Sequence, residues 1–343
     1  MRNDLFYKQI KDNNLNKPVV SIFEKYAKLH PEFQIFLITS PLGERYEYQY
    51  EENALIALIP NHKLIFLNLT DDTDSFEDYV EDVIQDLNSI SDKYKYMEHI
   101  DRARKWKGEV IESIQYDEHH FDIDTLLAQT HLHGELARKA DLLISLLTGS
   151  INDIDKVGVA QPETILEKVK KNIILFDGEQ TRFIFRNYAI KKMISVQGLS
   201  GTGKTELLLH KLKELYVKDD TSTIFFTCHN IALADKLRQR IPRFFDFMMV
   251  NKQIKWNERL WMTRAWGSKN NPDTGLYSYL CDYYNIPFCR FSPGVNYQFI
   301  FSKVLDALNA IPQKSFKPCF DYILVDESQD FPEVFFDVCK KVV

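Results

Sequence analysis

The sequence predicts an α/β protein in which a parallel sheet is preceded by a smaller α+β domain. From residue 161 onward, helical segments alternate with short apolar strands that each end in a polar turn. That pattern is typical of a parallel sheet with functional loops at the carboxyl ends of its strands. Before residue 149, apolar strand-like stretches come first and helical patterns follow, which is typical of an α+β unit. The length of 343 residues also favours two domains.

The composition is that of a globular chain, with 45% hydrophobic and 27% charged residues. No apolar run approaches the roughly 18 residues of a membrane span, and the N-terminus lacks the apolar stretch of a signal peptide. Five cysteines without a CxxC pair fit a reduced chain better than a disulfide framework or a zinc ribbon. We therefore expect a cytoplasmic protein with no membrane partner.

Charge is distributed unevenly along the chain, whose formal net charge is −6. Residues 1–160 contain 29 acidic and 17 basic side chains, whereas residues 161–343 contain 20 acidic and 26 basic ones. Only the second half is therefore suited to a phosphate-rich ligand, although binding to nucleic acid also needs a clustered basic patch.

The N-terminal domain is expected to span residues 1–148, the linker residues 149–160 and the second domain residues 161–343. Strands of a three-stranded meander are predicted at residues 33–40, 46–59 and 63–69, and helices at residues 75–87, 94–114 and 125–147. This pattern assigns no chemistry to the first domain. Its acidic run at residues 71–86 is expected to be a solvated helix face, and its histidine pairs lack further ligands at metal-binding spacing.

Short strands of the second domain are predicted at residues 193–196, 223–226 and 322–325. Residues 198–205 follow the first of these and precede a helical pattern, and they read GLSGTGKT. This is the GxxxxGK[ST] spacing of a phosphate-binding P-loop in its required strand–loop–helix context. The predicted nucleotide-binding residues are Gly198, Ser200, Gly201, Thr202, Gly203, Lys204 and Thr205.

Each residue type in this loop has a chemical reason. Glycines let successive backbone N–H groups converge on phosphate oxygens, and the helix that follows adds a favourable dipole. Lys204 would reach the β- and γ-phosphates, which makes it a catalytic candidate, and the Thr205 hydroxyl would ligate Mg²⁺. The predicted cofactors are therefore ATP and Mg²⁺.

A second acidic motif follows the strand at residues 322–325. Asp326 is expected to hold Mg²⁺, and Glu327 is expected to act as the general base that polarises the attacking water. An acidic turn alone is usually solvated, but its combination with a P-loop favours an ATPase.

The sequence resembles the superfamily 1 helicases of the UvrD/Rep type, whose second ATPase motif reads DExQD. Asp326, Glu327, Gln329 and Asp330 match this motif. The resemblance implies a P-loop NTPase with a RecA-like sheet and adds Gln329 to the catalytic set. Residues 176–180 resemble the Q motif of the family, which implies that Gln180 reads adenine.

Two further segments are similar to family motifs that contact single-stranded DNA. Residues 227–234 resemble TxTNxAA and residues 261–268 resemble TxHxF. The resemblance implies DNA contacts by Thr227, His229, Asn230, Thr263 and Arg264. Aromatic residues gather nearby and either stack on bases or pack in the core: Trp256, Trp261, Trp266, Tyr277, Tyr279, Tyr283 and Tyr284, with Lys255 and Arg259 among them.

The sequence also departs from this family. It ends 13 residues after Asp330, before the motifs of a second RecA-like domain. We therefore expect a helicase-like motor half, in bacterial defence or repair, whose ATPase is weak until a protein partner or a continuation of the chain supplies that domain. The alternative is an ATP-dependent switch or assembly module that binds a protein partner and unwinds nothing.

Overall fold

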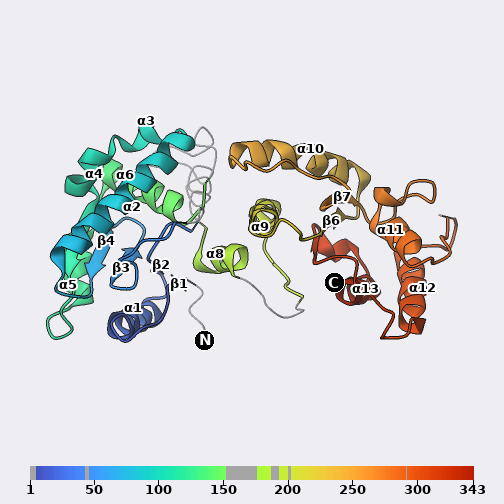
Figure 1. Cartoon of the computed structure of the whole chain (residues 1–343), viewed down its shortest axis with the longest axis horizontal. Helices are drawn as coiled ribbons and strands as arrows, with labels where there is room; N and C mark the ends of the chain where they lie inside the picture. Colours follow the sequence, from blue (N-terminus) through green and yellow to red (C-terminus); the bar gives the residue numbers. More distant parts are fainter. Residues whose placement is uncertain (1–4, 43–45, 152–175, 187–192, 200–201, 291) are drawn as a thin grey trace. The chain divides into compact units, whose positions relative to one another are not determined.

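The computed structural model describes residues 5–42, 46–151, 176–186, 193–199, 202–290 and 292–343 (Figure 1). Its contacts divide the chain into two compact units, residues 1–185 and residues 186–343. Each unit has its own sheet, and the two are described separately below.

The first unit is built on a five-stranded mixed sheet in the order β1-β2-β3-β4-β5. Its strands are β1 (Phe6–Gln9), β2 (Ile35–Ile38), β3 (Ala54–Leu58), β4 (Leu64–Asn68) and β5 (Ile111–Gln115). Strands β2, β3 and β4 form an antiparallel meander that corresponds to the predicted one, whereas β1 and β5 pair in parallel at the two sides. Every residue of β2, β3 and β4 is buried, which indicates that both faces of the sheet are covered.

Helices of the first unit cover this sheet (Figure 1). They are α1 (Lys17–Leu29), α2 (Thr73–Lys93), α3 (Met97–Ile100), α4 (Ala103–Glu109), α5 (Ile123–Thr130), α6 (Gly134–Leu147) and α8 (Gly178–Phe185). The predicted helix at residues 94–114 is wrong at its end, because residues from Ile111 pair with β4 instead. Helix α2 is capped by Asp72, whose carboxylate accepts a hydrogen bond from the Ser75 backbone N–H. Its outward positions are largely acidic and exposed, as predicted.

Helix α8 belongs to the first unit, which places the division of the chain later than the sequence predicted. The Arg182 guanidinium donates a 2.8 Å hydrogen bond to the Phe6 carbonyl of β1, and the Gln34 side chain donates one of 2.7 Å to the Phe176 carbonyl. The first unit is therefore the larger of the two. Residues 152–160, which make up most of the predicted linker, lie outside the described residues.

The second unit contains a parallel sheet in the order β7-β6-β8. Its strands are β6 (Ile224–Cys228), β7 (Leu260–Arg264) and β8 (Tyr322–Val325). Strands β6 and β8 confirm two of the predicted strands, and β7 was not predicted. The strand predicted at residues 193–196 is wrong: residues 193–199 are described and form no strand. The apolar pattern is there, but Met193 is 59% exposed and Ile194 is 39% exposed, so these side chains lack the burial that stabilises a core strand.

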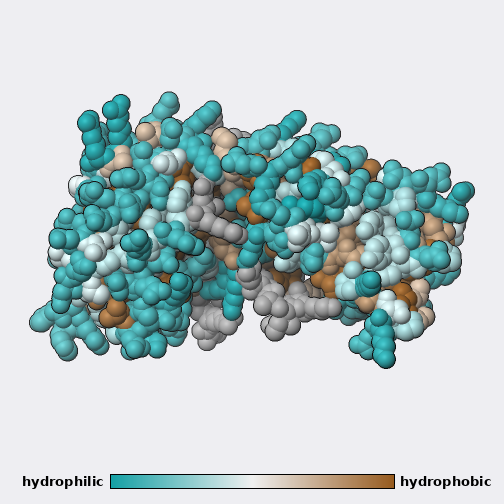
Figure 2. All heavy atoms as spheres, viewed as in Figure 1, coloured by the Kyte–Doolittle hydropathy of each residue, from teal (hydrophilic) through white to brown (hydrophobic). Residues whose placement is uncertain are grey.

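Helices of the second unit are α9 (Lys204–Lys218), α10 (Ile231–Phe247), α11 (Leu276–Tyr283), α12 (Tyr297–Ala310) and α13 (Glu333–Val342). Helix α10 packs against β6 and β7, and α9 packs against α10. A core shared by α11, α12 and α13 includes Phe225 of β6 and Trp261 of β7. In the view of Figure 2, the first unit shows mainly hydrophilic residues, whereas hydrophobic residues reach the surface around α12 and α13. Within the described ranges, no helix is both long and apolar enough to cross a membrane.

Candidate nucleotide site

Three predicted motif segments meet at one edge of the parallel sheet. Strands β6, β7 and β8 run in the same direction, so their carboxyl ends lie together. The ladder continues past the strands, because the Asp326 N–H donates to the Thr227 carbonyl at 3.0 Å and the Ala265 N–H to the Cys228 carbonyl at 3.1 Å. The acidic motif and both predicted DNA-contact segments therefore lie at this edge of the sheet.

The P-loop leads directly into helix α9. Gly203 is the residue before the helix and has φ +86°, a left-handed conformation that favours glycine. A Cβ at Gly198 would lie 2.8 Å from the Thr202 hydroxyl oxygen, so the Thr202 side chain would have to move to accommodate it. Ser200 and Gly201, two of the predicted ligands, lie outside the described residues. Of the described loop glycines, Gly203 is the one whose backbone conformation favours glycine.

Lys204 lies folded over its own loop. Its ammonium group donates hydrogen bonds to the carbonyl of Gly198 at 3.0 Å and to that of Leu199 at 2.9 Å. The Thr202 hydroxyl also donates to the Leu199 carbonyl. A lysine held in this way is close to the loop that it would serve, and a bound phosphate would compete with these carbonyls for its ammonium.

Thr205 and Asp326 form the contact that joins the P-loop helix to strand β8. The Thr205 hydroxyl donates to the Asp326 carboxylate at 2.9 Å, and the Glu327 N–H donates to the other carboxylate oxygen at 3.1 Å. Asp326 is only 3% exposed, and this burial raises its pKa, while the hydrogen bond from Thr205 acts in the opposite direction. A hydroxyl and a carboxylate side by side are oxygen ligands of the kind that Mg²⁺ prefers, so these residues fit a magnesium ion.

Glu327 has an unusual backbone conformation, with φ +51° and ψ +50°. A residue with a side chain loses about 1–3 kcal/mol in such a conformation, so the turn around it must hold it there. The Asp330 N–H donates to the Glu327 carbonyl at 3.1 Å, and the Gln329 side-chain amide donates to the Glu327 carboxylate at 2.6 Å. Gln329, predicted to be catalytic, is thus placed against the predicted general base.

Gln180 lies at the start of α8 and takes part in its cap. Its backbone N–H donates to the Asp177 carboxylate at 2.8 Å, and its side-chain oxygen accepts from the Asp177 N–H at 3.0 Å. This reciprocal pair is a capping box. Gln180 belongs to the first unit and the P-loop to the second, and its role in reading adenine stays a prediction.

The residues predicted to contact DNA differ in exposure. Thr227 is fully buried in β6, so the structure gives it no surface from which to contact nucleic acid. The Asn230 side chain accepts hydrogen bonds from the N–H groups of Ala232 and Leu233 and so caps helix α10. His229, Thr263 and Arg264 are partly exposed at the carboxyl edge of the sheet.

Most of the predicted aromatic and basic cluster packs inside the second unit. Trp261 and Tyr277 are buried in the core, and Trp256 stacks against Arg238, whose guanidinium carbon lies 3.6 Å from the ring centre. Core packing therefore accounts for Trp261 and Tyr277, whereas Tyr283 is 48% exposed and Trp266 is partly exposed. Among the described residues, no group of three potential metal-ligating His, Cys, Asp or Glu side chains is found.

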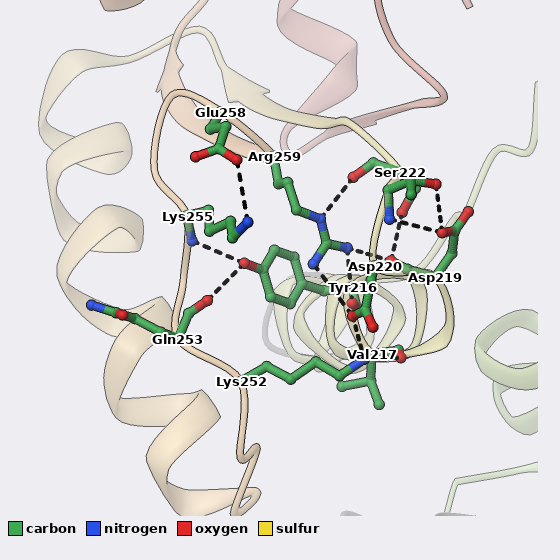
Figure 3. Close-up of polar contacts among 11 residues, drawn as sticks. Tyr216, Val217, Asp219, Asp220, Ser222, Lys252, Gln253, Lys255, Glu258 and Arg259 are labelled. Carbon is green, nitrogen blue, oxygen red and sulfur yellow. Dashed lines mark hydrogen bonds and ion pairs between the residues drawn. The ribbon is translucent and has the colours of Figure 1, made fainter.

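Arg259 secures the far end of the P-loop helix, a role that no sequence pattern indicated (Figure 3). Its side chain is buried, and its guanidinium donates hydrogen bonds to the carbonyls of Tyr216, Asp219 and Ser222. The guanidinium carbon also lies 4.2 Å from the centre of the Tyr216 ring. A cation at the carbonyl end of a helix is favoured by the helix dipole, so Arg259 stabilises α9 at the end opposite the P-loop.

A P-loop that opens a helix, with a buried carboxylate from a parallel strand beside it, defines a P-loop NTPase. Residues 160–332 match the family model described as type III restriction enzyme, res subunit. This match covers half of the chain, and the chain belongs to that family, whose domain is a helicase-like P-loop ATPase of superfamily 1 or 2 with a RecA-like fold. Such domains generally use ATP and Mg²⁺ and act as nucleic-acid motors. No curated protein and no solved structure matches the chain.

Proposed function

We propose that this chain contains an ATP- and Mg²⁺-dependent motor domain of the superfamily 1 helicase type that acts on DNA, single-stranded DNA above all. The observation that carries the proposal is the contact between Thr205 of the P-loop helix and Asp326 beside Glu327. It brings a hydroxyl, a buried carboxylate and a second carboxylate to the end of a P-loop. The DExQD spacing of residues 326–330 favours the UvrD/Rep type within the wider class.

In this proposal the residues of the chain divide the work. Lys204 exchanges its loop carbonyls for the terminal phosphates, while Thr205 and Asp326 hold the metal. The metal held by Thr205 and Asp326 would supply positive charge against the charge that develops on the phosphates. Glu327 accepts a proton from the attacking water, and Gln329 holds the Glu327 carboxylate in place. Gln180 selects adenine.

Nucleic acid is proposed to bind at the carboxyl edge of the sheet. Arg264 offers a guanidinium for phosphate, and His229 and Thr263 offer partly exposed polar side chains on the two neighbouring strands. The biological setting would be defence against foreign DNA, as in restriction, or repair.

Nucleotide titration of the purified chain tests the proposal. Wild type should bind ATP in the presence of Mg²⁺, Lys204→Ala should weaken binding severely, and Glu327→Gln should retain binding but abolish turnover. An oligothymidylate should raise the turnover of wild type. Unchanged ATP affinity in Lys204→Ala would refute the assignment of the P-loop.

A switch or assembly module that binds a protein partner is the second candidate. It is favoured by the finding that the Thr227 side chain is buried, which leaves one of the five predicted DNA contacts without an exposed surface. ATP binding with no effect of any nucleic acid on turnover would support this candidate over the motor.

A further inference from the structure

Tyr297, the first residue of α12, lies at the centre of an aromatic cluster that the motifs did not predict. Its ring centre is 4.5 Å from that of His229, 5.3 Å from that of Trp266 and 5.6 Å from that of Phe331. His229 and Phe331 also contact each other directly, at 5.6 Å. We call these four residues the aromatic junction.

The members of the aromatic junction come from four different parts of the second unit. His229 follows β6, Trp266 follows β7 and Phe331 follows the acidic loop after β8. Tyr297 comes from α12, outside every predicted motif. A single side chain therefore contacts both of the segments proposed to bind nucleic acid and also the segment that follows the proposed general base.

The junction is tightly connected on its ATP-site side. Phe331 is buried and stacks on Phe335 of α13, with ring centres 4.0 Å apart. The residue before it, Asp330, donates its N–H to the carbonyl of Glu327, the residue in the left-handed conformation. A shift of Phe331 would therefore alter the turn that positions the Glu327 carboxylate.

On the other side, the junction reaches the surface. His229, Trp266 and Tyr297 are partly exposed, so a ligand at the carboxyl edge of the sheet can touch the first two. One ring in a close-packed group cannot move without displacing the rings that it contacts, because protein interiors have few voids. A movement of His229 or Trp266 would then be passed to the Tyr297 ring and from there to Phe331.

We propose that Tyr297 is a positioning residue that couples nucleic-acid binding at the ends of β6 and β7 to ATP hydrolysis in the loop after β8. This inference rests on the proposed function. Where such coupling acts on binding, it typically changes an affinity by about 5- to 150-fold and is reciprocal, so nucleic acid and nucleotide change each other's affinity by the same factor.

The ring, and not the hydroxyl, carries the contact. The Tyr297 hydroxyl donates to the His229 carbonyl at 3.4 Å, which is long for such a bond, whereas the ring touches three partners. Tyr297→Phe is therefore the matched control, since it keeps the ring and loses the hydroxyl. Tyr297→Ala removes the ring, and Tyr297→Leu removes it while retaining most of the apolar volume, in case the alanine variant folds poorly.

Two measurements on the full chain test the proposal. The first is ATP turnover with and without an oligothymidylate, and the second is the affinity for that oligothymidylate with and without a non-hydrolysable ATP analogue. In wild type and Tyr297→Phe, we expect stimulation and a nucleotide-dependent affinity. In Tyr297→Ala and Tyr297→Leu, both ratios should fall toward one, whatever the change in basal turnover.

Three outcomes would overturn the proposal. If wild type is stimulated and the alanine and leucine variants keep the full stimulation and nucleotide dependence, the coupling role is wrong and the proposed motor function stands. If basal and stimulated turnover fall by the same factor in both variants, Tyr297 only supports the structure. In a third outcome, the oligothymidylate does not change the turnover of wild type, and the ATP analogue does not change its affinity for the oligothymidylate. The proposed function itself then fails, and the coupling fails with it.

Discussion

The Thr205 hydroxyl donates a 2.9 Å hydrogen bond to the carboxylate of Asp326, a residue 121 positions later in the chain. This contact joins the first turn of α9 to the end of β8. It places a hydroxyl and a buried carboxylate side by side, which is the preorganisation that a tight metal site requires. The relationship also makes the role of Thr205 testable apart from that of Lys204.

Replacing Thr205 with Ala should weaken binding of ATP in the presence of Mg²⁺ by about tenfold or more, the order of effect expected when a metal site loses a ligand or an orienting partner. Binding of ATP without the metal should change little, because the alanine variant keeps the loop and Lys204. Isothermal titration with and without Mg²⁺ checks this. Thr205→Ser keeps the hydroxyl and should behave like wild type. Equal losses with and without the metal would show that Thr205 supports the loop and not Mg²⁺.

Gln329 is expected to affect turnover and not binding. Its amide donates to the Glu327 carboxylate at 2.6 Å, so Gln329→Ala frees that carboxylate to rotate away from the attacking water. We expect kcat to fall by about tenfold with little change in ATP affinity, since a misplaced catalytic group costs rate and not ground-state binding. Single-turnover hydrolysis measures the effect, and the neighbouring Ser328→Ala is the control. A change confined to KM would contradict this role.

The sequence signals for the P-loop, the acidic turn and the strands beside them are local. The glycine spacing of residues 198–205 and the acidic turn at Asp326 each follow from a few consecutive residues, and strands β6 and β8 follow from short apolar runs. The contact of Thr205 with Asp326 could be expected only by combining two such motifs in one parallel sheet. These features need no knowledge of the rest of the fold.

The remaining features depend on partners that are far away in the chain. Residues 193–196 have the apolar pattern of a strand, but pattern alone does not provide the burial that a core strand needs. Residues Ile111–Gln115 extend a helical pattern, yet pairing with β4 makes them β5. The contacts of Arg259 with Tyr216 and of Tyr297 with His229 join side chains dozens of residues apart, and no periodicity signals them.

Arg259 is expected to stabilise the second unit substantially. Its side chain is buried and satisfies carbonyls at the end of α9, so Arg259→Ala leaves these acceptors without their donor. Leaving buried hydrogen-bond acceptors without their donor costs about 1–3 kcal/mol. Chemical denaturation measures this, with Lys255→Ala as the control, because Lys255 is exposed and its pair with Glu258 should contribute less than about 1 kcal/mol. A loss no larger than that of the control would refute the role of Arg259.

His210 is expected to make the fold sensitive to acid. It lies in α9 with its ring 4.9 Å from that of Phe244 in α10, and burial lowers its pKa to about 3 from the ordinary 6.5, with a further contribution from Lys213. Below pH 6.5 the unfolded chain therefore binds a proton that the folded chain does not, so the free energy of unfolding falls as the pH falls toward 3.

Between pH 7 and pH 5 this one group should cost about 2 kcal/mol of stability. His210→Leu removes the titrating group and keeps an apolar side chain at the interface of α9 and α10. The variant should therefore lose about 2 kcal/mol less than wild type over that interval, as measured by denaturation at the two pH values. Parallel pH curves for wild type and His210→Leu would show that His210 is not the group that protonates on unfolding.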